Sequence, residues 1–163
     1  AVQTGERTFE AAAYLRRHGA DPGLVHKLFR DEMATVVQRA KLVAEARTPI
    51  PGLAFSVYKN APSGDNTSVI LAQAADELVT MSEVKVSVVM AETENELLVS
   101  ARSDGSVNVQ TIMEELGGGG HQTVAGVQLK GVKAEEVEPQ IIELARKQME
   151  ERDTNESNIT ARY

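Results

Sequence analysis

The sequence predicts a small α/β domain with a mixed sheet of about four or five strands flanked by helices, preceded by helices of a neighbouring domain. Segments with apolar residues at helical spacing alternate with segments in which apolar and polar residues alternate strictly. The predicted order is helices, strand, helix, two strands, helix, strand and helix. With 163 residues, of which 42% are hydrophobic, the chain suits one domain plus part of another.

The composition excludes several classes of function. There is no cysteine, so the chain has no disulfide, thiolate nucleophile or cysteine-ligated zinc. The net charge of −7 argues against duplex DNA as a partner and means that an anionic ligand needs a local site. No run approaches the roughly 18 apolar residues of a spanning helix. We therefore expect a cytoplasmic segment that makes no membrane contact.

The N-terminal part is predicted to be helical. Its first helix covers about residues 8–18 and is ended by Gly19. Apolar residues at helical spacing continue over 21–44, which fits one long helix or two helices broken near residues 30–31. We assign residues 1–47 to the C-terminal helices of a neighbouring domain and a linker helix.

A second domain is predicted over residues 48–152. It begins at a proline-containing break and continues with a strand over 53–58, a polar loop over 60–66 and a helix from about 67 to 80. Asp76 in this helix fits a solvated charge and a member of a polar network equally well.

Two segments with period-two alternation, 84–91 and 97–102, predict an antiparallel hairpin. The alternation places Ser100 and Arg102 on one face of their strand. A hydroxyl and a guanidinium there can converge on a phosphate or a base. The alternative interpretation is a surface salt bridge made by Arg102.

The glycine-rich stretch 117–120 follows a short helix that Asn108 is predicted to cap. Four glycines expose backbone N–H groups to which an anion can bind, and His121 adds an imidazole donor at the start of a strand over 123–130. The alternative is a flexible loop in which Gly117 only ends the helix.

The C-terminal part is predicted to be a helix over about 134–152, followed by a polar, disordered tail over 153–163. Neither end of the chain adds a metal site. His18 and His26 are eight residues apart, lack a carboxylate cluster and are interpreted as ordinary histidines.

The run VNVQTIMEELGGGGHQTVAG (107–126), with ELLVSARS (96–103) before it, resembles the DHH-associated domain of the DHH phosphoesterase family. Residues 4–21 resemble the end of the DHH domain that precedes it. Together with residues 71–78, they are most similar to the branch of GdpP-type cyclic-di-AMP phosphodiesterases.

The resemblance implies a bacterial signalling hydrolase that converts cyclic di-AMP to linear pApA. It implies two manganese ions on the upstream DHH domain, membrane helices further upstream, and a chain that binds nucleotide but is inactive alone. The implied partners are a cyclic dinucleotide or short oligonucleotide and the DHH domain of the same protein, with a homodimer left open. The implied phosphate ligands are Arg102, Gly118, Gly119, Gly120 and His121, and the weaker candidates for base or sugar contacts are Ser100, Ser103 and Asn108.

Two alternative functions stay open. The glycine–histidine stretch is shared with nanoRNA/pAp phosphatases and RecJ-like single-strand exonucleases of the same family. A non-catalytic alternative is an RNA-binding domain like that at the C-terminus of alanyl-tRNA synthetases.

Overall fold

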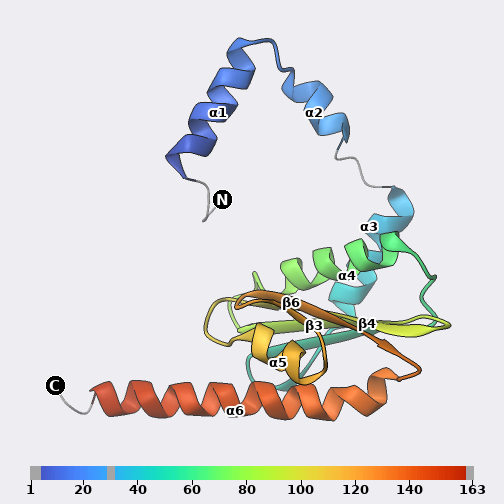
Figure 1. Cartoon of the computed structure of the whole chain (residues 1–163), viewed down its shortest axis with the longest axis vertical. Helices are drawn as coiled ribbons and strands as arrows, with labels where there is room; N and C mark the ends of the chain where they lie inside the picture. The colour runs from blue at the N-terminus through green and yellow to red at the C-terminus, as the bar shows by residue number, and fades with distance from the viewer. Residues whose placement is uncertain (1–4, 29–31, 161–163) are drawn as a thin grey trace. The chain divides into compact units, whose positions relative to one another are not determined.

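The computed structural model describes residues 5–28 and 32–160. The chain forms two compact units that divide between Met33 and Ala34. Figure 1 labels the helices and strands of the chain. The first unit contains α1 (Glu6–Arg17) and α2 (Pro22–Leu28). The helix α3 (Met33–Ala44) follows, so the segment 21–44 forms two helices. The break predicted near residues 30–31 lies outside the described residues.

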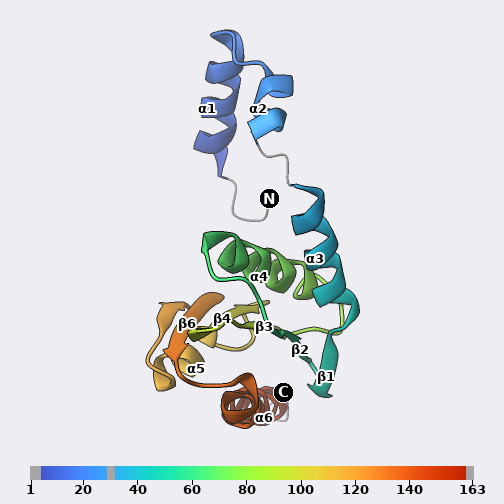
Figure 2. The same cartoon turned by 90° about the vertical axis from the view of Figure 1, so that its right-hand side faces the viewer.

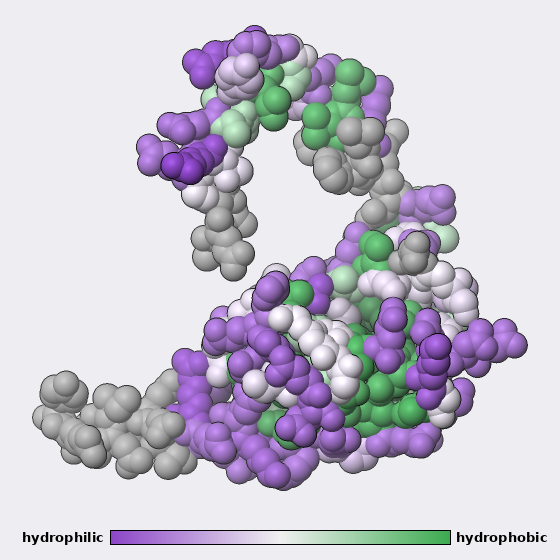
Figure 3. All heavy atoms as spheres, viewed as in Figure 1, coloured by the Kyte–Doolittle hydropathy of each residue, from purple (hydrophilic) through white to green (hydrophobic). Residues whose placement is uncertain are grey.

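The first unit exposes its apolar side chains (Figure 3). No residue of α1, all of which the structure describes, is buried. Phe9 is 65% exposed, Leu15 58% and Leu24 59%. These helices therefore have no hydrophobic core of their own within the described residues.

The second unit is built on a mixed six-stranded sheet with the order β1-β2-β3-β4-β6-β5. Only the pair β2 and β3 is parallel. The strands are β1 (Arg47–Ile50), β2 (Leu53–Tyr58), β3 (Val86–Glu92), β4 (Glu96–Ser103), β5 (Gly119–His121) and β6 (Val124–Lys130). The predicted α/β class is confirmed, and the two short edge strands β1 and β5 raise the strand number above the predicted four or five.

Helices cover both faces of this sheet (Figure 2). On one face lie α3 and α4 (Asp65–Leu78), and on the other α5 (Val109–Glu115) and α6 (Ala134–Thr160). The sheet can bury side chains on both faces because those of successive strand residues point to opposite sides. Leu71 of α4 packs in one cluster with Val89, whereas Met113 of α5 packs in the other with Val88.

Two predicted boundaries differ from the structure. Leu42 of α3 is buried in the cluster that contains α4, so α3 packs with the sheet unit, and the second compact unit begins before residue 48. Residues 153–160, predicted to be a disordered tail, continue α6, whereas 161–163 lie outside the described residues. A formed helix adds one hydrogen bond for each further residue, so polar residues can extend it without an apolar face.

The segments that the structure describes include no helix with both the length and the apolar character required to cross a bilayer.

Candidate functional site

The first two glycines of the glycine stretch end α5. Gly117 has a φ of 84°. Its N–H donates to the Glu114 carbonyl at 2.9 Å, and the Gly118 N–H donates to the Met113 carbonyl at 2.8 Å. This pair of bonds is a Schellman motif. The Gly118 N–H, predicted to face a phosphate, is therefore engaged in the helix cap.

The next two glycines are part of the sheet. Gly119 and Gly120 form β5 with His121 and pair antiparallel with β6. A Cβ atom on Gly118 would collide with the Gly126 carbonyl, and one on Gly120 with the Val124 carbonyl. The stretch is thus a cap followed by a tightly packed edge strand, not a flexible loop. Alternate N–H groups of an edge strand point away from the sheet and have no strand partner.

The strand register places Arg102 and His121 in one row. Arg102 of β4 pairs with Val124 of β6, and Val124 pairs with His121 of β5. Side chains at directly paired positions point to the same face of a sheet. His121 is exposed, and Val124 between the two is 43% exposed. A guanidinium and an imidazole therefore flank a small apolar surface on the face that α4 covers.

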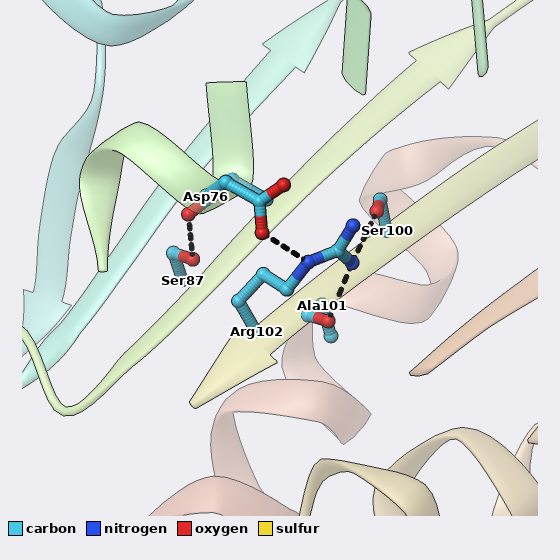
Figure 4. A network of polar contacts seen from close by, with 6 residues as sticks. Asp76, Ser87, Ser100, Ala101 and Arg102 are labelled. Atoms are coloured by element: carbon cyan, nitrogen blue, oxygen red, sulfur yellow. Dashed lines mark hydrogen bonds and ion pairs between the residues drawn. The ribbon is translucent and has the colours of Figure 1, made fainter. Parts of the chain in front are cut away.

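Arg102 is held by three hydrogen bonds (Figure 4). Its Nε donates to Asp76 Oδ1 on α4 at 2.5 Å, and its Nη1 donates to Ser100 Oγ and the Ala101 carbonyl at 3.0 Å each. The Arg102 side chain is 11% exposed and that of Asp76 60%. The ion pair considered as an alternative is thus formed, with Asp76 in a polar network. The Nη2 nitrogen of Arg102 makes no hydrogen bond within the part of the chain that the structure describes.

A cavity of about 510 Å³ lies next to this row. Ser68 of α4, Ser100 of β4 and Gln128 of β6 contribute polar groups to its lining, and Leu71 and Leu98 contribute apolar walls. Ser100 connects the cavity to the row, because its hydroxyl also accepts a hydrogen bond from Arg102. Its volume falls in the range of about 300–1,000 Å³ typical of small-molecule sites.

Two predicted site residues lie elsewhere. Ser103 follows Arg102 by one residue and so points to the opposite face of β4, where its Oγ accepts hydrogen bonds from the Gly105 and Val107 N–H groups. Asn108 caps α5 through a hydrogen bond from the Gln110 N–H, and its own N–H donates to Gln148 of α6. Both side chains form hydrogen bonds that stabilise the turn and helix after β4, and neither lines the cavity.

The sequence reasoning did not single out Ser68 or Gln128 as site residues. A signal for Gln128 existed, because strict alternation along β6 puts it on the same face as Val124 and Gly126. No comparable signal existed for Ser68, whose position depends on how α4 packs on the sheet.

The described residues of this site do not form a cluster of metal ligands. Over residues 5–28 and 32–160, no group of three or more histidine, aspartate or glutamate side chains is placed to hold a metal ion. These residues do not fit a dinuclear metal centre, so we assign no metal-dependent step to them.

The fold and the site together define a mixed α/β domain in which a glycine–histidine edge strand lies beside a polar cavity. Residues 52–151 match the family model described as the DHHA1 domain, and the chain belongs to this family. The predicted resemblance to the DHH-associated domain is thereby confirmed.

Relatives support the same branch. The chain is 46% identical over 143 residues to "Cyclic-di-AMP phosphodiesterase GdpP" of Geobacillus thermodenitrificans (strain NG80-2), covering 87% of this chain and 21% of that protein. It is 43% identical over 143 residues to "Cyclic-di-AMP phosphodiesterase PdeA" of Listeria monocytogenes serotype 1/2a (strain 10403S), covering 86% and 21% respectively. The chain thus spans about 21% of the length of these curated relatives.

The fold is also found in the crystal structure of an exopolyphosphatase-related protein from Bacteroides fragilis. The two chains superpose with a TM-score of 0.69 at 13% identity, covering 92% of this chain and 46% of the other. At this identity, the likeness concerns the fold alone.

Proposed function

We propose that this chain is the nucleotide-binding part of a phosphodiesterase that hydrolyses cyclic di-AMP to linear pApA. The observation that carries the proposal is the row of Arg102, Val124 and His121 beside the cavity of about 510 Å³. The names of the two relatives above, both cyclic-di-AMP phosphodiesterases, support this substrate.

In this proposal the row binds a phosphate. The Nη2 nitrogen of Arg102 donates from one side of Val124, and the imidazole of His121 donates from the other. Outward-facing N–H groups of the edge strand β5 add main-chain donors. Charge-assisted hydrogen bonds of this kind are roughly twice as strong as neutral ones, which suits a small anionic ligand.

Bond cleavage is assigned to another part of the protein. The chain contributes binding and orientation, which hold a phosphodiester in place for a reacting group that approaches from outside. A net charge of −7 repels long polyanions but is compatible with a local contact to one phosphate. A short nucleotide is therefore a better ligand than a long nucleic acid.

The proposal is tested by titrating the ¹⁵N-labelled chain of 163 residues with cyclic di-AMP, pApA and AMP while amide signals are followed by NMR. We expect saturable shifts centred on Gly119, His121 and Arg102. Shifts centred on other parts of the chain, or none at millimolar ligand, would contradict the proposal.

The same titration separates the alternatives. Tighter binding of a short single-stranded RNA than of cyclic di-AMP would favour the oligonucleotide-degrading enzymes of the family. Tight binding of transfer RNA, with no response to dinucleotides, would favour an RNA-binding domain.

A further inference from the structure

Cross-strand register orders the face beneath α4 into three successive rows of residues. Successive rows are two residues apart along each strand, which corresponds to about 7 Å. The rows are Arg102, Val124 and His121, then Ser100, Gly126 and Gly119, then Leu98 and Gln128. The first row thus carries a guanidinium and an imidazole, and the middle row carries almost no side-chain atoms. The third row carries a carboxamide beside a leucine.

Packing explains only one of the two glycines in the middle row. Gly126 must be a glycine, because a Cβ atom there would lie 2.7 Å from the Val99 carbonyl oxygen. Gly119 has no such constraint. Its φ is outside the left-handed region, and apart from its chain neighbours no described atom lies within 4 Å of a Cβ atom built on it. The fold alone would accept a side chain at Gly119. Because glycine has none, the surface between the first and third rows stays open.

The third row presents an unused hydrogen-bonding group. Gln128 is exposed and lines the cavity, and its carboxamide makes no hydrogen bond with any residue in 5–28 or 32–160. A carboxamide offers a donor and an acceptor side by side. Leu71 and Leu98 give the cavity apolar walls, against which a flat ring can pack.

We propose that Gln128 reads the nucleobase of the bound nucleotide and favours adenine. The inference rests on the proposed function, in which the phosphate lies on the row of Arg102 and His121. The sugar then crosses the bare middle row and places the base in the cavity. The Gln128 carbonyl accepts from the adenine N6 amino group while its amide donates to N7. Guanine presents two acceptors at the same edge, so only one of these bonds forms.

The test compares AMP, GMP and ribose 5-phosphate as ligands of the 163-residue chain, before and after Gln128→Leu. The wild-type chain should bind AMP about tenfold more tightly than GMP, the discrimination expected of one bidentate pair. Gln128→Leu should bring the two affinities within about twofold and leave that for ribose 5-phosphate unchanged. Gln140→Leu, an exposed position on α6 at the other face of the sheet, is the matched control and should keep the wild-type ratio.

The outcomes separate this inference from the proposed function. An unchanged AMP-to-GMP ratio in Gln128→Leu, or an equal loss for all three ligands, would overturn the base-reading role alone. A wild-type chain that binds none of the three would overturn the phosphate site as well. A second readout requires no variant, because the side-chain NH₂ signals of Gln128 should shift with AMP and not with ribose 5-phosphate. Signals that stay in place with AMP would contradict the inference.

Discussion

Arg102 of β4 and Asp76 of α4 form an ion pair across the layer between helix and sheet, with Arg102 Nε at 2.5 Å from Asp76 Oδ1. The two partners are unequally covered, at 11% exposure for the Arg102 side chain and 60% for that of Asp76. The guanidinium is therefore fixed beneath the surface, while the carboxylate stands at its outer edge. Asp76 orients the cation and also lowers the positive potential that a phosphate would meet there under the proposed function.

Replacing Asp76 with asparagine should tighten binding of ribose 5-phosphate. The asparagine Oδ1 can still accept from Arg102 Nε, and Ser100 and Ala101 still hold Nη1, so orientation is kept while one negative charge is lost. A unit charge roughly 6 Å away in a water-like dielectric contributes on the order of 0.7 kcal/mol, which corresponds to about threefold in affinity. The measurement is isothermal titration calorimetry at low salt.

The control for this change is Glu77→Gln. It removes the same charge from the same helix, at a residue that pairs with Arg39 instead. It should leave the affinity within about twofold, because the Glu77 carboxylate is paired with Arg39 and does not contact Arg102. A weaker or equal affinity in Asp76→Asn would show that orientation by the carboxylate outweighs its charge, contrary to this expectation.

His121→Ala should weaken phosphate binding without affecting the fold. The His121 side chain is exposed and is not part of the hydrophobic core. The free energy of unfolding should therefore change by less than about 0.5 kcal/mol. Loss of one hydrogen bond to a charged group should reduce affinity for ribose 5-phosphate by about tenfold. Thermal unfolding and calorimetry on the same sample check both parts.

His18→Ala in the first unit is the matched histidine control, because its imidazole contacts the Tyr14 carbonyl and ring. Equal affinities of wild-type chain and His121→Ala would remove His121 from the site.

The chain should not hydrolyse cyclic di-AMP when manganese is added. No metal-holding cluster of three or more histidine, aspartate or glutamate side chains occurs among the residues that the structure places. Chromatographic detection of pApA after prolonged incubation is the measurement, and the NMR titration shows whether the same sample binds the nucleotide. Product that forms with manganese and disappears with a chelator would contradict this expectation.

Local patterns predicted the sheet better than they predicted its edges. The hairpin of β3 and β4 and the cap at Asn108 each depend on neighbours in the chain, and alternation or a capping residue reveals them. The edge strand β1 carries Pro49 and only four residues, so it shows no alternation. Its pairing comes from the contact with β2, which is a tertiary effect.

The same distinction applies to the site, where features set within one strand were predicted and features set by packing were not. Period-two alternation correctly placed Ser100 and Arg102 on one face, because face is a property of a single strand. The partner of Arg102 could not be chosen from the sequence, since Asp76 lies 26 residues away on a helix whose rotation is set by packing. The glycine stretch was interpreted as one loop because composition does not show that Gly117 and Gly118 complete a helix cap before a strand begins.

Substitution of three of the four glycines by alanine, one at a time, should separate stability from binding. Gly120→Ala should destabilise the fold by more than about 2 kcal/mol, because a φ of 148° and a collision with the Val124 carbonyl both oppose a side chain. Gly117→Ala should cost about 1–2 kcal/mol, since its φ of 84° is left-handed. Gly119→Ala meets neither obstacle and should keep the free energy of unfolding within about 1 kcal/mol.

Gly119→Ala should nevertheless weaken nucleotide binding, because its methyl group would occupy the open surface over which the sugar is proposed to lie. Denaturant unfolding measures the stability of each variant, and calorimetry with AMP measures affinity for those that fold. Gly105→Ala is the control for the strain in Gly117→Ala and Gly120→Ala, since Gly105 has a φ of 100° and lies outside the proposed site. If Gly119→Ala binds AMP as tightly as the wild-type chain, the bare middle row has no role in recognition. If it unfolds as readily as Gly120→Ala, Gly119 is required by the fold and does not serve to keep the surface open for a ligand.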